Sequence, residues 1–235
     1  MYKGITAVIL AGGKGTRLKP FTVNFPKPLM PIADKPILEI IIRKLKKSGF
    51  RDIIIATGHL DEMIRLYFQD GKKFGVTIRY SREEKPLGTA GPLHAIRRRL
   101  KRTFLLINGD VVADVDFDRM LRFHRLHGSQ ATIGLARRTV HVDFGVVQLN
   151  EKLDFSKWSE KPDLDYLVSM GIYFMEPEVI DLIPPTRFFN LPDLIVKADK
   201  AGLLVKGFTH DGYWLDIGRP EDYERACNET ERFNW

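Results

Sequence analysis

The chain has 235 residues, enough for one sizeable α/β or β domain, and 44% hydrophobic with 11% aromatic residues exclude disorder as its main state. Its 37 Lys and Arg residues outnumber 30 Asp and Glu, so the surface favours anionic partners such as nucleic acid, an acidic membrane or phosphorylated small molecules. No apolar run approaches the roughly 20 residues of a membrane span, and the N-terminal sequence lacks a signal-peptide pattern. With a single cysteine, Cys227, no internal disulfide can form, so we expect a soluble, unprocessed protein of the reducing cytoplasm.

Short β-rich runs alternate with helical patterns in the first half, which is typical of a parallel sheet joined by crossover helices. A strand at 6–10 precedes a Gly- and Pro-rich stretch, 12–36, whose length indicates a functional loop. Apolar residues at helical spacing predict a helix over 37–47, and Asp61 is predicted to cap the next helix. The other elements predicted here are strands at 53–57, 76–80 and 104–107 and helices at 61–69, 90–100 and 117–127.

The second half is less regular. Strands are predicted at 131–136, 145–149, 166–174 and 203–207, and helices near Pro177, near Leu191 and from Pro220 onward. No linker-like composition, internal repeat or low-complexity tract divides the chain. The sequence therefore predicts one α/β domain with a doubly wound, Rossmann-like, mixed but mainly parallel sheet.

A glycine-rich loop follows the first predicted strand. Its sequence LAGGKGTRLKP, residues 10–20, places three glycines and several cations where the carboxyl edge of a sheet opens into a ligand crevice. The glycines let backbone N–H groups approach a phosphate, and Arg17 adds charge; a flexible turn is the plain structural alternative. The dinucleotide fingerprint is excluded because Leu18 stands where it needs glycine, and the P-loop because no Gly-Lys-Ser or Gly-Lys-Thr follows.

A lysine between two prolines extends this loop. Lys27 lies in PKPLMPI, residues 26–32, and the flanking prolines stiffen the backbone that presents its ammonium. Such a lysine is suited to hold a point charge on a phosphate.

Together, LAGGKGTRLKP and PKPLMPI resemble the signature of the sugar-1-phosphate nucleotidylyltransferases, also called nucleotide-sugar pyrophosphorylases. The resemblance covers residues 5–225 and implies a sheet of the nucleotide-diphospho-sugar transferase type. It implies a nucleotide-binding half at 1–130 and a sugar-phosphate-binding half at 131–235, without the C-terminal β-helix domain of some relatives. EEKPLGTAGPL, residues 83–93, and MLRFHRLHGSQATI, residues 120–133, are similar to the mannose-1-phosphate guanylyltransferase branch.

The nucleotide site implied by the resemblance comes from the glycine-rich loop, the 83–89 segment and the end of the strand at 104–107. Its residues are Leu10, Ala11, Gly12, Gly13, Gly15, Thr16, Arg17, Lys27, Glu83, Pro86, Gly88, Thr89, Asn108 and Gly109. As plain structure, the 86–88 segment is a turn and Thr89 a helix cap.

Two aspartates complete the implied chemistry. Asp110 follows Asn108-Gly109, and Asp216 lies in GYWLDIGRPEDY, residues 212–223. The resemblance implies that both bind Mg²⁺, which prefers carboxylates, phosphate oxygens and water. The neighbouring Trp214 is interpreted as core packing, and Asp116 as a helix cap or loop residue.

The implied sugar-phosphate site draws on FGVV (144–147), WSEKP (158–162) and SMGIY (169–173). Its residues are Gly145, Glu160, Lys161, Ser169 and Gly171. The family more often has asparagine where Ser169 stands, so this position leaves the identity of the sugar open.

The implied reaction is attack by the sugar 1-phosphate on the α-phosphorus of a nucleoside triphosphate, with release of pyrophosphate. The resemblance implies that Arg17, Lys27 and Asp110 are the catalytic residues. GTP and mannose-1-phosphate are favoured as substrates, and a heptose-1-phosphate with GTP, or UTP, dTTP or CTP with glucose-1-phosphate or another sugar-1-phosphate, are the alternatives. Two alternatives belong to other classes: a catalytically silent regulatory protein that binds nucleotide sugars, and a nucleic-acid-binding module. We expect no nucleic-acid or membrane partner. Family precedent allows a homodimer.

Overall fold

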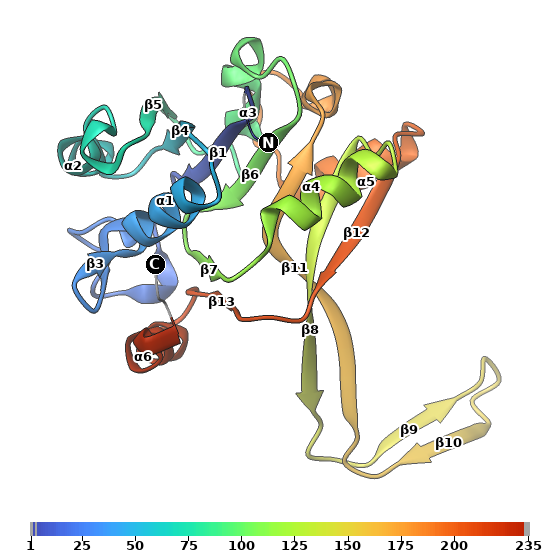
Figure 1. Cartoon of the computed structure of the whole chain (residues 1–235). Coiled ribbons are helices and arrows are strands. Elements are labelled where there is room, and N and C mark those ends of the chain that lie inside the picture. The colour runs from blue at the N-terminus through green and yellow to red at the C-terminus, as the bar shows by residue number, and fades with distance from the viewer. Residues whose placement is uncertain (1, 3, 233–235) are drawn as a thin grey trace.

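The computed structural model describes residues 2 and 4–232, so the outermost ends of the two predicted halves lie outside the described residues. A seven-stranded mixed sheet forms the centre, in the order β12-β8-β11-β6-β1-β4-β5 (Figure 1). Strand β11 runs antiparallel to both neighbours, and the other pairs are parallel. The predicted doubly wound, mainly parallel sheet is therefore confirmed.

The bounds of the elements follow the predicted order closely in the first half. The sheet strands are β1 (Thr6–Ala11), β4 (Asp52–Thr57), β5 (Thr77–Arg82), β6 (Phe104–Asn108), β8 (Ala131–His141), β11 (Asp163–Met175) and β12 (Val205–His210). The helices are α1 (Ile37–Lys47), α2 (Asp61–Phe68), α3 (Gly91–Ile96), α4 (Phe117–Leu126), α5 (Leu191–Lys200) and α6 (Pro220–Asn228). Short paired strands are β2 (Pro31–Ile32) with β3 (Lys35–Pro36), β7 (Val111–Ala113) with β13 (Trp214–Asp216), and β9 (Val146–Leu149) with β10 (Phe155–Ser159).

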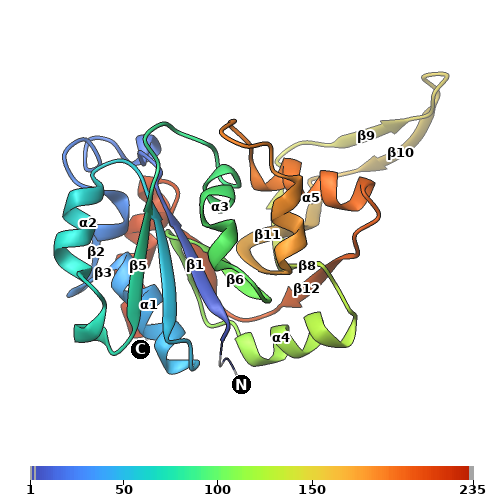
Figure 2. The same ribbon diagram turned by 90° about the horizontal axis from the view of Figure 1, so that it is seen from above.

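Helices cover both faces of the sheet because alternate strand residues point to opposite sides. Ile53 and Ile55 pack in one core with α1, α2 and α4, whereas Ile54 packs in the other with α3 and α5. Figure 2 shows these helices on the two sides of the strands. None of the helices in the described part of the chain is long and apolar enough to cross a bilayer.

The predicted cap Asp61 is wrong, and so is the structural alternative in which Thr89 caps a helix. Asp61 is the first residue of α2, not its cap, and its carboxylate accepts a hydrogen bond from Arg65 Nε at 2.7 Å. Asp116 does cap α4, since its side chain accepts from Arg119 N at 2.9 Å. Thr89 does not cap the helix that follows it; its Oγ1 accepts from Leu191 N, at the start of α5, at 2.8 Å.

The chain order places a ligand site at one end of the sheet. After β1 the chain builds β4 and β5 on one side, and then returns to build β6 on the other side of β1. Ligands of open α/β sheets bind at the carboxyl ends of the strands where the winding direction reverses in this way.

Beyond the sheet, β8 and β11 continue as a two-stranded ribbon that ends in the β9–β10 hairpin. We call residues 137–167 the arm. It projects away from the rest of the molecule in both orientations (Figures 1 and 2).

Candidate active site

A cavity of about 430 Å³ lies at the carboxyl ends of β1, β4 and β6. Its walls contain every predicted nucleotide-binding residue and both predicted metal-binding aspartates. Sequence reasoning missed six further wall residues: Pro28, Ala56, Leu87, Pro92, Phe188 and Gly218.

The glycine-rich loop leaves β1 and forms a 3₁₀ turn, Thr16–Leu18, instead of a long helix. Gly15 begins this turn with φ of 60°, a left-handed conformation that favours glycine. Its carbonyl accepts a hydrogen bond of 2.7 Å from the Thr22 hydroxyl, which ties the loop to its own continuation. The turn places Thr16 and Arg17 in the wall of the cavity.

Arg17 joins this loop to the C-terminal part of the chain. A Cβ added to Gly218 would lie 3.2–3.4 Å from the guanidinium nitrogens and Cζ of Arg17. The glycine at 218 therefore leaves the space in which the cation lies beside the cavity.

The two aspartates meet because β7 pairs with β13. Asp216 is opposite Val111 in this ladder, and Ile217 N donates to Asp110 O at 3.0 Å. Burial raises the pKa of Asp216 and the Asp110 charge raises it further, while Lys27 acts in the opposite direction. The structure thus brings together two carboxylates that are far apart in the sequence.

Lys27 forms an ion pair with Asp110 Oδ2. Only 8% of the lysine is exposed, and the short helical turn of residues 27–29 holds it at the cavity wall. A buried ammonium needs such a partner because an unpaired charge in a low-dielectric interior is costly. The structure therefore places Lys27 beside Asp110, the first of the two aspartates predicted to bind a metal.

The residues present are chemically suited to a divalent cation. The described residues include no group of three or more His, Cys, Asp or Glu side chains that could hold a metal ion. Two carboxylates whose charges repel each other, as Asp110 and Asp216 do, can hold a hard cation when phosphate oxygens and water supply the remaining ligands.

Glu83 forms a separate polar feature of the cavity wall. Its Oε2 accepts a hydrogen bond of 2.8 Å from Leu87 N, and a Cβ added to Gly12 would lie 2.5 Å from its Oε1. Burial raises the pKa of Glu83, although the Leu87 N–H partly opposes this shift. A carboxylate is thereby fixed between the glycine-rich loop and the 86–89 turn.

The 86–91 segment is fastened to the chain before α5. Phe189 N donates to Leu87 O at 2.8 Å, and Phe189 O accepts from Ala90 N and Gly91 N at 2.9 and 3.1 Å. These bonds position Phe188 at the cavity wall, where its ring is exposed. No local sequence signal marks this residue, because only the tertiary pairing brings it to the site.

The predicted sugar-phosphate residues form a second group outside the cavity wall. Glu160 Oε2 accepts from Trp158 Nε1 at 3.0 Å, and a Cβ added to Gly145 would lie 2.6 Å from the Trp158 ring. Gly145, Trp158 and Glu160 therefore pack together in the arm. Lys161 follows with φ of 41°.

Ser169 and Gly171 connect the two groups. Gly171 has φ of 70°, and a Cβ there would lie 2.5 Å from Asn108 Nδ2, so β11 passes directly behind the cavity wall. The Ser169 hydroxyl is hydrogen-bonded to the Tyr173 hydroxyl at 2.8 Å and accepts from Gly171 N at 3.3 Å. Trp214 donates from Nε1 to Met170 O at 3.0 Å and packs against the core, as predicted.

Comparison with known proteins matches residues 6–232 to the nucleotidyl transferase family. The chain belongs to the nucleotidyl transferase family. It is 38% identical to a UTP–glucose-1-phosphate uridylyltransferase of Synechocystis sp. over 94% of this chain and 62% of that protein. It is 33% identical to a mannose-1-phosphate guanylyltransferase of Mycobacterium tuberculosis over 97% of this chain and 65% of that protein.

Solved structures agree with the family fold. HddC from Yersinia pseudotuberculosis, in a crystal structure complexed with GMP-PN, superposes with a TM-score of 0.74 at 25% identity, covering 96% of this chain and 99% of that one. This chain spans less than two thirds of the length of the two curated relatives named above, but nearly the whole length of the HddC structure.

Proposed function

We propose that the chain is a sugar-1-phosphate nucleotidylyltransferase that makes GDP-mannose and pyrophosphate from GTP and mannose-1-phosphate. The observation that carries the proposal is the convergence of Arg17, Lys27, Asp110 and Asp216 on one cavity that the glycine-rich loop also lines. Two polyanions must meet in this reaction, so alignment and charge neutralisation are the main tasks of the site.

The reaction forms a bond between an oxygen of the sugar 1-phosphate and the α-phosphorus of GTP. The bond from that phosphorus to the bridging oxygen breaks, and pyrophosphate leaves with the electron pair. The attacking oxygen is already ionised at neutral pH, so no general base is needed. Arg17 and the backbone of the 13–16 turn stabilise the departing charge, and Lys27 lies at the transferring phosphate.

Asp110 and Asp216 are the residues that hold Mg²⁺ in this proposal. The cation supplies charge neutralisation and polarisation at the phosphate oxygens when it is bound. Asp110 has a second role, because it orients the Lys27 ammonium through their ion pair.

Glu83 supports guanine as the base. The edge of guanine presents two adjacent N–H donors, which one carboxylate can accept together. Uracil and thymine present an N–H flanked by two carbonyl oxygens, which a carboxylate repels. The guanine nucleotide in the similar HddC structure also favours this assignment.

The sugar phosphate is assigned to the second group, where Lys161 holds the phosphate and Glu160 accepts from sugar hydroxyls. Mannose-1-phosphate is favoured by similarity to mannose-1-phosphate guanylyltransferases, and a heptose-1-phosphate is the alternative.

The substrate assignment is tested by pyrophosphate release with Mg²⁺ for GTP, UTP, dTTP, CTP and ATP against mannose-, glucose- and heptose-1-phosphate. We expect activity in the GTP series, highest with mannose-1-phosphate. Activity confined to UTP and glucose-1-phosphate, the substrates named for the Synechocystis relative, would replace the base and sugar assignment but keep the mechanism.

A further inference from the structure

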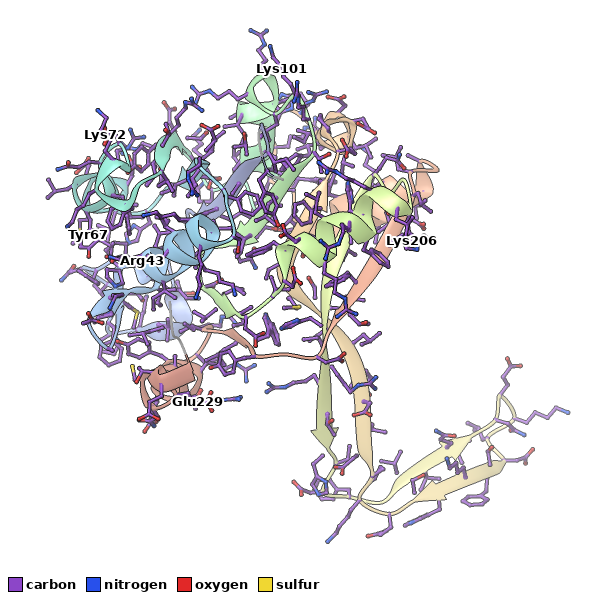
Figure 3. All side chains as sticks on the ribbon, in the orientation of Figure 1. Arg43, Tyr67, Lys72, Lys101, Lys206 and Glu229 are labelled. Atoms are coloured by element: carbon purple, nitrogen blue, oxygen red, sulfur yellow. The ribbon has the colours of Figure 1, made fainter. Side chains whose placement is uncertain are left out.

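The arm leaves an unusual amount of apolar surface uncovered. None of the residues 137–167 is buried. The exposed large hydrophobic residues in this range are Val140, Phe144, Val147, Leu149, Leu153, Phe155, Trp158, Tyr166 and Leu167. In Figure 3 the side chains of the arm stand clear of every other element.

The β9–β10 hairpin separates its residues into an apolar and a polar face. Phe155 is opposite Leu149, and Trp158 is opposite Val147. The register shift between Phe155 and Lys157 adds one residue to β10, so these four side chains share one face. They are 65%, 52%, 59% and 44% exposed, respectively. The alternate pairs, Lys157 with Gln148 and Ser159 with Val146, lie on the other face, which is polar except for Val146. We call the four-residue surface the hairpin face.

A hairpin of this kind is poorly stable by itself. An isolated two-stranded ribbon is marginal in water, and exposed strand edges readily pair with other chains. The hairpin is joined to the sheet by a continuous ladder, since β8 and β11 pair from Ala136–Val168 to His141–Asp163. A further bond of 3.1 Å from Val142 N to Pro162 O extends this ladder to the base of the hairpin.

We propose that the hairpin face binds the same face of a second copy of this chain, in a two-fold symmetric dimer. Two amphipathic ribbons can pack face to face, as stacked sheets do, with both polar faces outward. The pairing is self-complementary, because each copy supplies the same apolar surface that the other must cover.

The area and charge of the arm fit this occupant. From the exposed fractions of its four side chains, the hairpin face offers on the order of 400 Å² of accessible surface. A standard interface buries ~800 Å² on each partner, and somewhat more than half of that area is apolar. The hairpin face is therefore about as large as the apolar part of one side of such an interface. The arm carries five Lys and Arg and six Asp and Glu residues, although the whole chain has a net charge of +7. A second nearly neutral arm meets no net repulsion, whereas nucleic acid or an anionic membrane would require an excess of cations.

Dimerisation also fixes part of the proposed sugar-phosphate group. Trp158 belongs to the hairpin face and donates to Glu160, so a partner that covers its ring restricts the Glu160 carboxylate. This consequence rests on the proposed function, whereas the association itself does not.

Two matched variants on adjacent residues test the interface. Leu149→Glu places a charge in the hairpin face, and Gln148→Glu places the same charge on the opposite face of the same strand. Sedimentation velocity over a range of concentrations is expected to give a species of twice 27.0 kDa for the wild type and for Gln148→Glu. We expect Leu149→Glu to raise the dimer Kd at least about tenfold. Both sites are exposed, and circular dichroism checks that each variant is folded.

A second readout needs no variant. Tryptophan emission of the wild type should shift to shorter wavelength as its concentration rises, because the Trp158 ring becomes covered. A wild type that remains monomeric at all concentrations, or a dimer that both variants weaken equally, would overturn the proposal. A monomer whose emission shifts only when GTP and mannose-1-phosphate are added would assign the hairpin face to closure over substrate instead.

Discussion

Replacement of Lys27 by methionine separates the chemical role of this lysine from its structural role. The substitution keeps most of the side-chain volume but removes the charge that pairs with Asp110. Breaking a fully buried ion pair costs about 3–5 kcal/mol. Here the lysine side chain is 10% exposed but that of Asp110 is 25% exposed, so solvent screens the remaining carboxylate and about 2–3 kcal/mol is expected.

The variant should therefore remain folded, since domains of this kind have roughly 5–15 kcal/mol of stability. Its turnover should nevertheless fall by about 10²–10³-fold, which is the usual effect of removing one preorganised charge from a transition state. Pyrophosphate release at saturating substrates measures the turnover, and thermal unfolding measures the stability of the same sample.

Lys35→Met is the matched control. Lys35 lies in the same loop region and pairs with Asp34, but this ion pair is exposed. We expect little change in either turnover or unfolding temperature for this variant. Removal of a charge that stabilises the transition state should lower turnover by much more than about threefold. If Lys27→Met is folded and its turnover stays within about threefold of wild type, the assignment of Lys27 to the transferring phosphate is wrong.

Other substitutions probe the rest of the site and the fold. Glu83→Gln should lower kcat/KM for GTP relative to UTP, and an unchanged GTP-to-UTP ratio would refute the base assignment. Burial raises the pKa of Glu83, so its charge is less stable in the fold than in solvent, and the unfolding temperature of the variant at pH 7 should not fall. Gly109→Ala should lower stability and activity, because its Cβ would lie 2.6 Å from a β1 carbonyl oxygen. Gly13→Ala has open space around its Cβ and should unfold at the wild-type temperature in calorimetry. Equal losses of stability in the two variants would contradict this packing argument. His124 and a threonine hydroxyl outweigh burial and hold the pKa of Glu176 below its ordinary 4.5, so the Glu176 contribution to stability is present above that pH and is lost as the pH falls through the folded-state pKa. Urea unfolding of Glu176→Gln should therefore vary less with pH below about 4.5 than that of wild type, and parallel curves would exclude this role.

Local periodicity predicted the elements of the core well. The helix expected over 37–47 is observed as Ile37–Lys47, because its apolar residues at helical spacing pack against the sheet. In contrast, β8 and β11 are longer than the strands predicted at 131–136 and 166–174. Apart from the buried Met175, their additional residues belong to the exposed arm and include Arg137 and Asp165, so no burial pattern marks them as strand.

The site could be predicted where a contiguous motif encodes it. The glycine-rich loop and Lys27 lie close together in the sequence, and both reach the cavity. The short strands β7, β10 and β13 were missed, because three to five residues carry little periodicity and β7–β13 is a long-range pairing. Phe188 could not be found for a similar reason, since hydrogen bonds between Leu87 and Phe189 bring it to the cavity.

We propose above all that the cavity lined by Arg17, Lys27, Asp110 and Asp216 is where a nucleotidyl group is transferred to a sugar phosphate. Phosphorus NMR of the chain with GTP, mannose-1-phosphate and Mg²⁺ tests it most directly, because the technique distinguishes a new phosphate–phosphate linkage from hydrolysis. We expect two coupled diphosphate resonances of a nucleotide sugar to grow together with pyrophosphate, and to be absent with Asp110→Asn. Unchanged spectra both with this pair and with UTP and glucose-1-phosphate, or GDP and inorganic phosphate as the products, would contradict this mechanism.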